Sequence, residues 1–211
     1  MALADGPFSR HKGRIGNIVY GNTLGGNAAR TYQPKPRYSN TPGQQKQRSK
    51  HTGLVRYARQ INTALKATMS VSGLKMSAYN RFYKLNVQKV DDASQKWIDA
   101  EIENIQFSVG TNENARNPAA AAATGAAINL TFANSGYSPA TNINSVVYWY
   151  AYNVTKDVIF SGGGTDTLSS GATSITGIGG AGDVVRVFVL TINPTNGQTS
   201  DSSHVASVTL T

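Results

Sequence analysis

The sequence contains no cysteine. This absence excludes a disulfide scaffold, a thiolate metal site and a cysteine nucleophile. Charged residues make up only 15% of the 211 residues, against about 25% in an average soluble domain. No stretch approaches the ~18 consecutive apolar residues of a membrane-spanning helix, and the N-terminus lacks the apolar core of a secretory signal. We therefore expect neither a membrane span nor a cleaved signal peptide, and a protein made in the cytoplasm.

Acidic residues are almost missing from the first 90 residues, where Asp5 stands alone against 16 Lys and Arg. Residues 91–211 hold ten acids and four basic residues. The formal charges of the two parts are therefore +15 and −6, which sum to the +9 of the chain. So large a split indicates two units with different partners, the first suited to a polyanion or an acidic protein surface.

Residues 1–40 form a basic, glycine-rich arm with a possible β-hairpin. Ile15 to Tyr20 and Ala28 to Tyr32 are the expected strands, with Asn22 to Asn27 as the turn. Pro34 and Pro36 then favour extended backbone. A segment this polar buries too little apolar surface to be stable alone, so we expect it to fold onto a partner.

Residues 41–90 have the pattern of a helical hairpin. Thr41 is a good N-cap and Pro42 suits the first helical position. The first helix carries an apolar stripe, and the second, over about 76–87, is expected to bury the face of Met76, Tyr79, Tyr83 and Val87. The stripe of the first helix consists of Leu54, Ala58, Ile61, Leu65 and Met69.

Residues 91–104 form an acidic hinge, and residues 105–211 change to the two-residue period of β-strands. We expect seven strands, at 105–109, 128–132, 146–152, 158–160, 168–178, 184–192 and 204–210, with the alanine-rich segment 119–123 as a loop and Trp149 in the core. Short strands between turn clusters are typical of an immunoglobulin-like sandwich, and without a Cys–Trp–Cys pattern the fibronectin type is nearer. The predicted fold class is α+β: an arm or hairpin, a helical hairpin and an immunoglobulin/fibronectin-like β-sandwich.

No pattern of residues predicts an enzyme, a cofactor or a metal site. His11, His51 and His204 have no carboxylate at ligand spacing. The glycine-rich loops lack the strand-to-helix context of a phosphate cradle, and the acids of the second half are typical of turns.

The basic arm and the first helix supply the candidate contacts. Lys and Arg bind phosphates with release of counterions, and tyrosines stack on exposed bases. The same residues suit an acidic protein neighbour, so nucleic acid and protein subunits both remain open, without base-specific readout. The candidates are Arg10, Lys12, Arg14, Arg30, Lys35, Arg37, Arg48 and Arg59.

The run from Tyr148 to Tyr152 is rich in aromatic residues. Such a strand either stacks on a glycan or, more often, packs in a sandwich core on one side and against a neighbour on the other.

Four motifs stand out in the first 80 residues: Gly13-Arg-Ile-Gly-Asn-Ile-Val19, Arg30-Thr-Tyr-Gln-Pro34, Asn40-Thr-Pro-Gly-Gln-Gln-Lys-Gln-Arg48 and Met76-Ser-Ala-Tyr-Asn80. Together they resemble a domain family of Bacteroidota and their phages that has no established activity. That family has a glycine-basic start, a helix that opens with a TPxQ motif, a helix with an SAYN motif and a β-rich second half. The chain departs from it at Gly43 and in the alanines at 119–123.

These observations favour a non-enzymatic structural or assembly protein. The resemblance implies a phage or mobile-element context, and with it we expect a virion component, such as a capsid, head-associated or tail protein, in contact with other virion subunits and with copies of itself. The alternatives are a sequence-nonspecific nucleic-acid-binding protein and a surface module that binds glycans. No small-molecule substrate and no membrane partner is expected.

Overall fold

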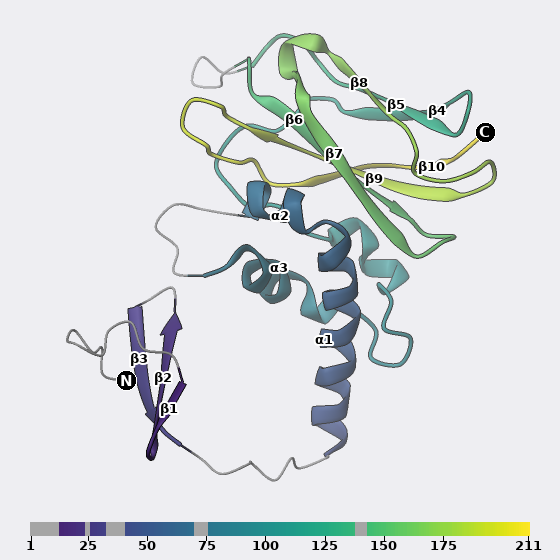
Figure 1. The fold of residues 1–211 in the computed structure, drawn as a ribbon. Coiled ribbons are helices and arrows are strands. Elements are labelled where there is room, and N and C mark those ends of the chain that lie inside the picture. The colour runs from purple at the N-terminus through teal and green to yellow at the C-terminus, as the bar shows by residue number, and fades with distance from the viewer. Residues whose placement is uncertain (1–12, 24–25, 33–40, 70–75, 138–142) are drawn as a thin grey trace.

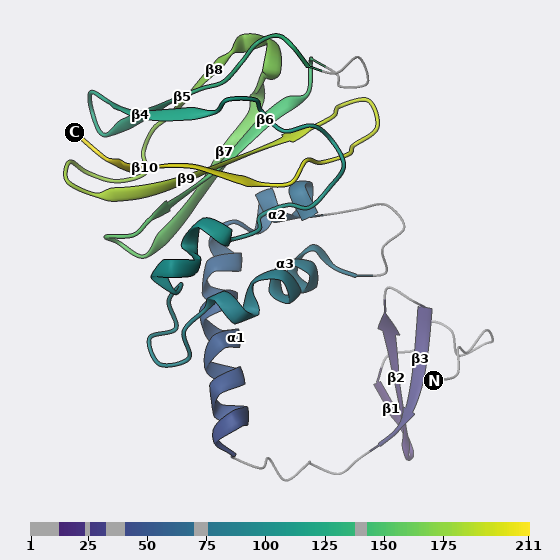
Figure 2. The same ribbon diagram turned by 180° about the vertical axis from the view of Figure 1, so that it is seen from behind.

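A computed structural model of the chain describes residues 13–23, 26–32, 41–69, 76–137 and 143–211. These residues form a small N-terminal sheet, a layer of helices and a two-sheet sandwich (Figure 1). The view from behind shows the same order, with the helices lying against one sheet of the sandwich (Figure 2). The fold is α+β, and its β-rich part is an immunoglobulin/fibronectin-like sandwich, as the sequence predicts.

The N-terminal sheet is an antiparallel meander of β1 (Gly13–Ile15), β2 (Ile18–Thr23) and β3 (Gly26–Thr31). The expected hairpin is therefore present, but the first expected strand is divided in two. Gly16 has a φ of 59°, and the two-residue loop Gly16-Asn17 joins β1 to β2. Glycine at the first position of such a loop is the requirement of a type II′ turn.

The first helix begins where the sequence predicts. Thr41 is the N-cap, its hydroxyl accepts a bond from the Gln44 amide at 3.4 Å, and Pro42 is the first helical residue. The helix is interrupted at Ile61, which separates α1 (Pro42–Gln60) from α2 (Asn62–Met69). The predicted apolar stripe, from Leu54 to Met69, is buried in full.

The second predicted helix is α3 (Ala78–Asn86), capped by Ser77 and followed by the 3-10 turn η1 (Val87–Lys89). The expected buried face of this helix is confirmed in part, because Tyr79, Tyr83 and Val87 are partly buried and pack against the core. Phe82 and Asn86 are fully buried, whereas Met76 is 40% exposed. Asn86 can be buried because its side chain donates to the carbonyls of Phe82 and Gln106 and accepts from the Gln106 amide.

The sandwich consists of two antiparallel sheets. One has the order β4-β5-β8, from β4 (Ala119–Ala123), β5 (Ala127–Thr131) and β8 (Ala172–Ile175). The other has the order β10-β9-β6-β7. Its strands are β6 (Val146–Asn153), β7 (Val158–Thr167), β9 (Val184–Ile192) and β10 (Ser203–Thr209).

The first strand of the sandwich is not the one we expected. Residues 105–109 form no strand, because side chains bind their amides: Ser202 Oγ accepts from the Phe107 amide at 2.9 Å. The segment expected to be a loop, Ala119–Ala123, is instead β4 at the sheet edge. Its alanines are too few for a stable helix, and pairing with β5 satisfies their backbone.

The four-stranded sheet is buried on both faces. One face packs against the sheet β4-β5-β8 through the valines of β9. The other face packs against the helices, with Phe107 stacked on Tyr150 at 4.3 Å and in contact with Phe188 at 5.0 Å. Helices and sandwich thus share a core, and no side chain of β1–β3 that the structure describes belongs to either buried cluster.

The segment expected to be an acidic hinge, residues 91–104, is packed into that shared core. Trp97 and Ile102 are buried, and Trp97 stacks on Tyr57 of α1 at 4.8 Å. Glu103, in the 3-10 helix η2 (Asp99–Asn104), pairs with Arg186 of β9 at 3.0 Å. The segment holds the helices against the sandwich.

Candidate partner-binding surfaces

The eight predicted contact residues do not form one patch. Arg10, Lys12, Lys35 and Arg37 lie outside the described residues. The other four divide between two surfaces: Arg14 and Arg30 lie on the N-terminal sheet, and Arg48 and Arg59 lie on α1.

The strand register brings Arg14 and Arg30 to one face of the N-terminal sheet. Val19 of the central strand pairs with Arg14 on one side and with Arg30 on the other. Directly opposed residues of antiparallel strands point to the same face, so the three side chains form a row. Tyr32 joins them, because the Arg14 guanidinium lies 3.6 Å from the centre of its ring. We call these four residues the basic face.

The opposite face of the same sheet is apolar. Ile15 pairs with Ile18, and Tyr20 pairs with Ala29. Because side chains alternate along a strand, these four residues lie on the side away from Arg14 and Arg30. Ile15 is 52% exposed and Ile18 is 43% exposed. We call these four residues the apolar face, and within the described chain nothing buries its two isoleucines.

The helices form the second basic surface. Arg48 and Arg59 are exposed and lie eleven residues apart, about three helical turns, so they project from the same side of α1. Arg59 forms no ion pair with any described residue. It borders a groove of about 330 Å³ between α1 and α3, whose other lining residues include Val55 and Tyr79. No acidic side chain lines this groove.

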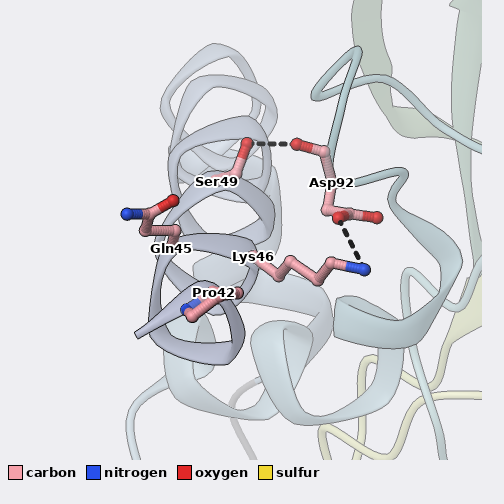
Figure 3. A pocket seen from close by; sticks show the side chains of 5 residues that line it. All are labelled: Pro42, Gln45, Lys46, Ser49 and Asp92. Atoms are coloured by element: carbon pink, nitrogen blue, oxygen red, sulfur yellow. Dashed lines mark hydrogen bonds and ion pairs between the residues drawn. The ribbon is translucent and has the colours of Figure 1, made fainter. Parts of the chain in front are cut away.

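Two other basic residues of α1 are neutralised by the body of the protein. Lys46 pairs with Asp92 at 3.7 Å across a hollow of about 390 Å³, where Ser49 also donates to the Asp92 carbonyl (Figure 3). Arg56 pairs with Asp157 at 2.7 Å. Each of these two cations therefore faces an acidic side chain of the protein itself, whereas Arg59 faces none among the described residues.

Asp157 is the centre of a polar cluster that the sequence does not reveal. It lies in the turn between β6 and β7 with a left-handed φ of 56°, and its Oδ1 accepts bonds from the hydroxyls of Tyr57 and Tyr152. Burial and the bond to Asp157 raise the pKa of Tyr57 to about 12. Burial and the nearby Tyr57 raise the pKa of Tyr152 further. Both tyrosines are therefore neutral donors at physiological pH.

The tyrosines of β6 do not form an open stacking surface. Tyr150 and Tyr152 are 0% and 3% exposed because the helices cover that face of the sheet. Tyr150 instead shares a hydrogen bond of 2.8 Å with Thr68 of α2. The prediction that the aromatic run packs in a core is confirmed for these two rings, and the layer that covers them is formed by the chain's own helices.

In the part of the chain that the structure describes, no three His, Asp or Glu side chains cluster to hold a metal ion. His51 bonds the Tyr79 hydroxyl at 3.2 Å, and His204, on β10, packs edge-on against Phe188 with 5.3 Å between the ring centres. Among the described helices, none is long and apolar enough to span a membrane.

No family model and no curated protein matches the sequence. Among solved structures, the chain resembles the fn3 domain of human collagen alpha-1(XX) chain, with 16% sequence identity and a TM-score of 0.33. The match covers 46% of this chain and 82% of that domain.

Proposed function

We propose that the chain is a non-enzymatic structural protein of an assembled particle, and that its N-terminal sheet anchors it to neighbouring subunits. The observation that carries this proposal is the unburied apolar face of β1–β3. A sheet of three short strands needs a packed face to be stable, yet neither core includes any side chain described in this sheet. A neighbouring subunit is the natural source of that packing.

The rest of the molecule fits the role of a rigid body displayed by such an anchor. Helices and sandwich are joined by a shared aromatic core and by the Tyr57–Asp157 cluster. The low fraction of charged residues and the resemblance of the N-terminal motifs to a phage-associated family favour a virion component. Arg14 and Arg30 on the sheet suit contact with acidic neighbouring subunits.

Mass spectrometry of particles purified on a density gradient tests this proposal. If the protein is a virion component, its peptides co-sediment with the particles in a fixed ratio to the major subunit. Removal of residues 1–32 abolishes that co-sedimentation while the truncated chain stays folded by circular dichroism. Recovery of the full-length chain only in the unassembled fraction contradicts the proposal.

A second candidate is nonspecific binding to nucleic acid, favoured by the row of Arg14, Val19 and Arg30 beside Tyr32. Such binding draws its affinity from phosphate contacts and falls steeply with salt. Fluorescence anisotropy with a labelled single-stranded oligonucleotide measures it. Arg30→Glu weakens binding if this face is the contact, and an unchanged affinity removes this candidate.

A further inference from the structure

We infer that the apolar face of β1–β3 packs against the same face of a second copy of the chain. This inference rests on the proposed function and names the neighbour of the anchor. The two sheets stack face to face, about 10 Å apart as in other sheet packings, and a two-fold axis relates them.

A second copy of the chain offers a surface that complements the apolar face. Among the described residues, three large apolar side chains are more than a third exposed: Ile15, Ile18 and Met76. Two of them are neighbours on the apolar face, and Met76 stands by itself before α3. Ile15 and Ile18 are therefore the one adjacent pair of large exposed apolar side chains among the described residues. The complement that the chain itself supplies is a second apolar face.

The distribution of charge on the sheet favours the same pairing. The guanidinium of Arg14 and the side chain of Arg30 lie on the basic face, opposite to Ile15 and Ile18. Packing of the two apolar faces keeps these cations on the outside of the pair, where water or an anion solvates them. Packing of the two basic faces would instead bring four arginines together.

The size of the apolar face determines how strongly two copies pair. Three strands of up to six residues present a face on the order of 300 Å² at ordinary strand spacing and rise. A stable interface buries about 800 Å² on each partner. One pair of faces therefore binds weakly, and repetition around a particle supplies the stability through effective concentration. The pairing in solution is best captured by cross-linking.

Because the sequence has no cysteine, each cross-linking variant carries a single thiol at a known position. Ile18→Cys places it on the apolar face, and Val19→Cys places it on the basic face one residue away. Treatment of the full-length chain with a short bismaleimide is expected to give at least fivefold more covalent dimer with Ile18→Cys. Adding Ile15→Lys to Ile18→Cys is expected to suppress that dimer, and Arg30→Ala to leave it unchanged.

Equal cross-linking of the two thiols, or stronger cross-linking through Val19→Cys, overturns the inference. So does an Ile18→Cys dimer that survives Ile15→Lys. Circular dichroism confirms that each variant is folded, which is expected because Ile18 and Val19 lie outside both cores. If neither thiol cross-links while the chain still co-sediments with particles, the anchor binds a different subunit: the inference fails and the proposed function stands.

Discussion

The hydroxyl of Tyr57, on α1, donates a hydrogen bond to Oδ1 of Asp157, in the turn between the two strands β6 and β7. One hundred residues separate them. The same carboxylate accepts from Tyr152 at 2.8 Å and pairs with Arg56 at 2.7 Å. This cluster joins the helical layer to the sandwich and makes the two one rigid body.

Asp157→Ala is expected to lower the free energy of unfolding by about 2–3 kcal/mol, because it leaves partly buried hydroxyls without their acceptor. It also places alanine at a left-handed φ, which asparagine tolerates better. Asp157→Asn should therefore cost less. Urea denaturation measures both, with the exposed Asp99→Asn as control, and equal stability of Asp157→Ala and the wild type contradicts the role of the cluster.

Alkaline pH is expected to destabilise the protein through the same tyrosines. In the unfolded chain tyrosine ionises with a pKa near 10, whereas Tyr57 in the folded protein ionises at about 12. The folded state thus holds its protons longer, and stability falls as the pH rises from about 10 through 12. Tyr57→Phe should make the fall shallower. A wild-type stability that does not change over this range argues against the buried, bonded hydroxyl.

Acidic pH is expected to destabilise the protein through protonation of Asp183. Its carboxylate pairs with Lys156 at 2.8 Å and accepts bonds from the Gly180 amide and the Asn153 side chain. The pair with Lys156 and these bonds lower its pKa to about 2 from an ordinary value of 3.8. The contribution to stability is present above about pH 4 and is lost as the pH falls toward 2. Thermal melts of Asp183→Asn should show a smaller loss than the wild type over that range.

Phe107→Ala is expected to cost about 3–5 kcal/mol, as for other large buried aromatic residues. Phe107 contacts rings of both layers, Phe82 of α3 and Tyr150 of β6. Its loss should lower one unfolding transition, seen alike by far-UV circular dichroism and tryptophan fluorescence. Ile18→Ala, outside both cores, should change that transition by less than about 0.5 kcal/mol. Two separate transitions would show that helices and sandwich fold independently.

Local signals of the sequence predict its elements well. The cap at Thr41, the buried stripe from Leu54 to Met69 and most strands of the sandwich follow from periodicity and turn residues. The predictions that are wrong concern segments whose structure depends on tertiary contacts. Ala119–Ala123 becomes a strand only because β5 pairs with it. Trp149 is half-buried and not at the centre of the core as expected. Its ring packs directly on Gly162, where a Cβ atom would lie only 2.3 Å from the ring.

The candidate site shows the same limit. Composition identifies Arg14 and Arg30 as contacts, but their common face depends on the register with Val19, which the sequence does not fix. The apolar face cannot be predicted from the sequence either, because it depends on the same strand register. Arg48 and Arg59 are found from helical spacing alone, whereas the Asp157 cluster joins distant segments and leaves no local pattern.

The central claim is that the sheet β1–β3 is completed by a neighbouring subunit. Hydrogen–deuterium exchange of the amides in residues 18–31 tests it most directly, in dilute free protein and in purified particles. The account predicts fast exchange of these amides in the free chain, slowing at least tenfold in the particle, while the amides of β9 are protected in both. Equal protection of residues 18–31 in the dilute chain and in the particle would contradict it.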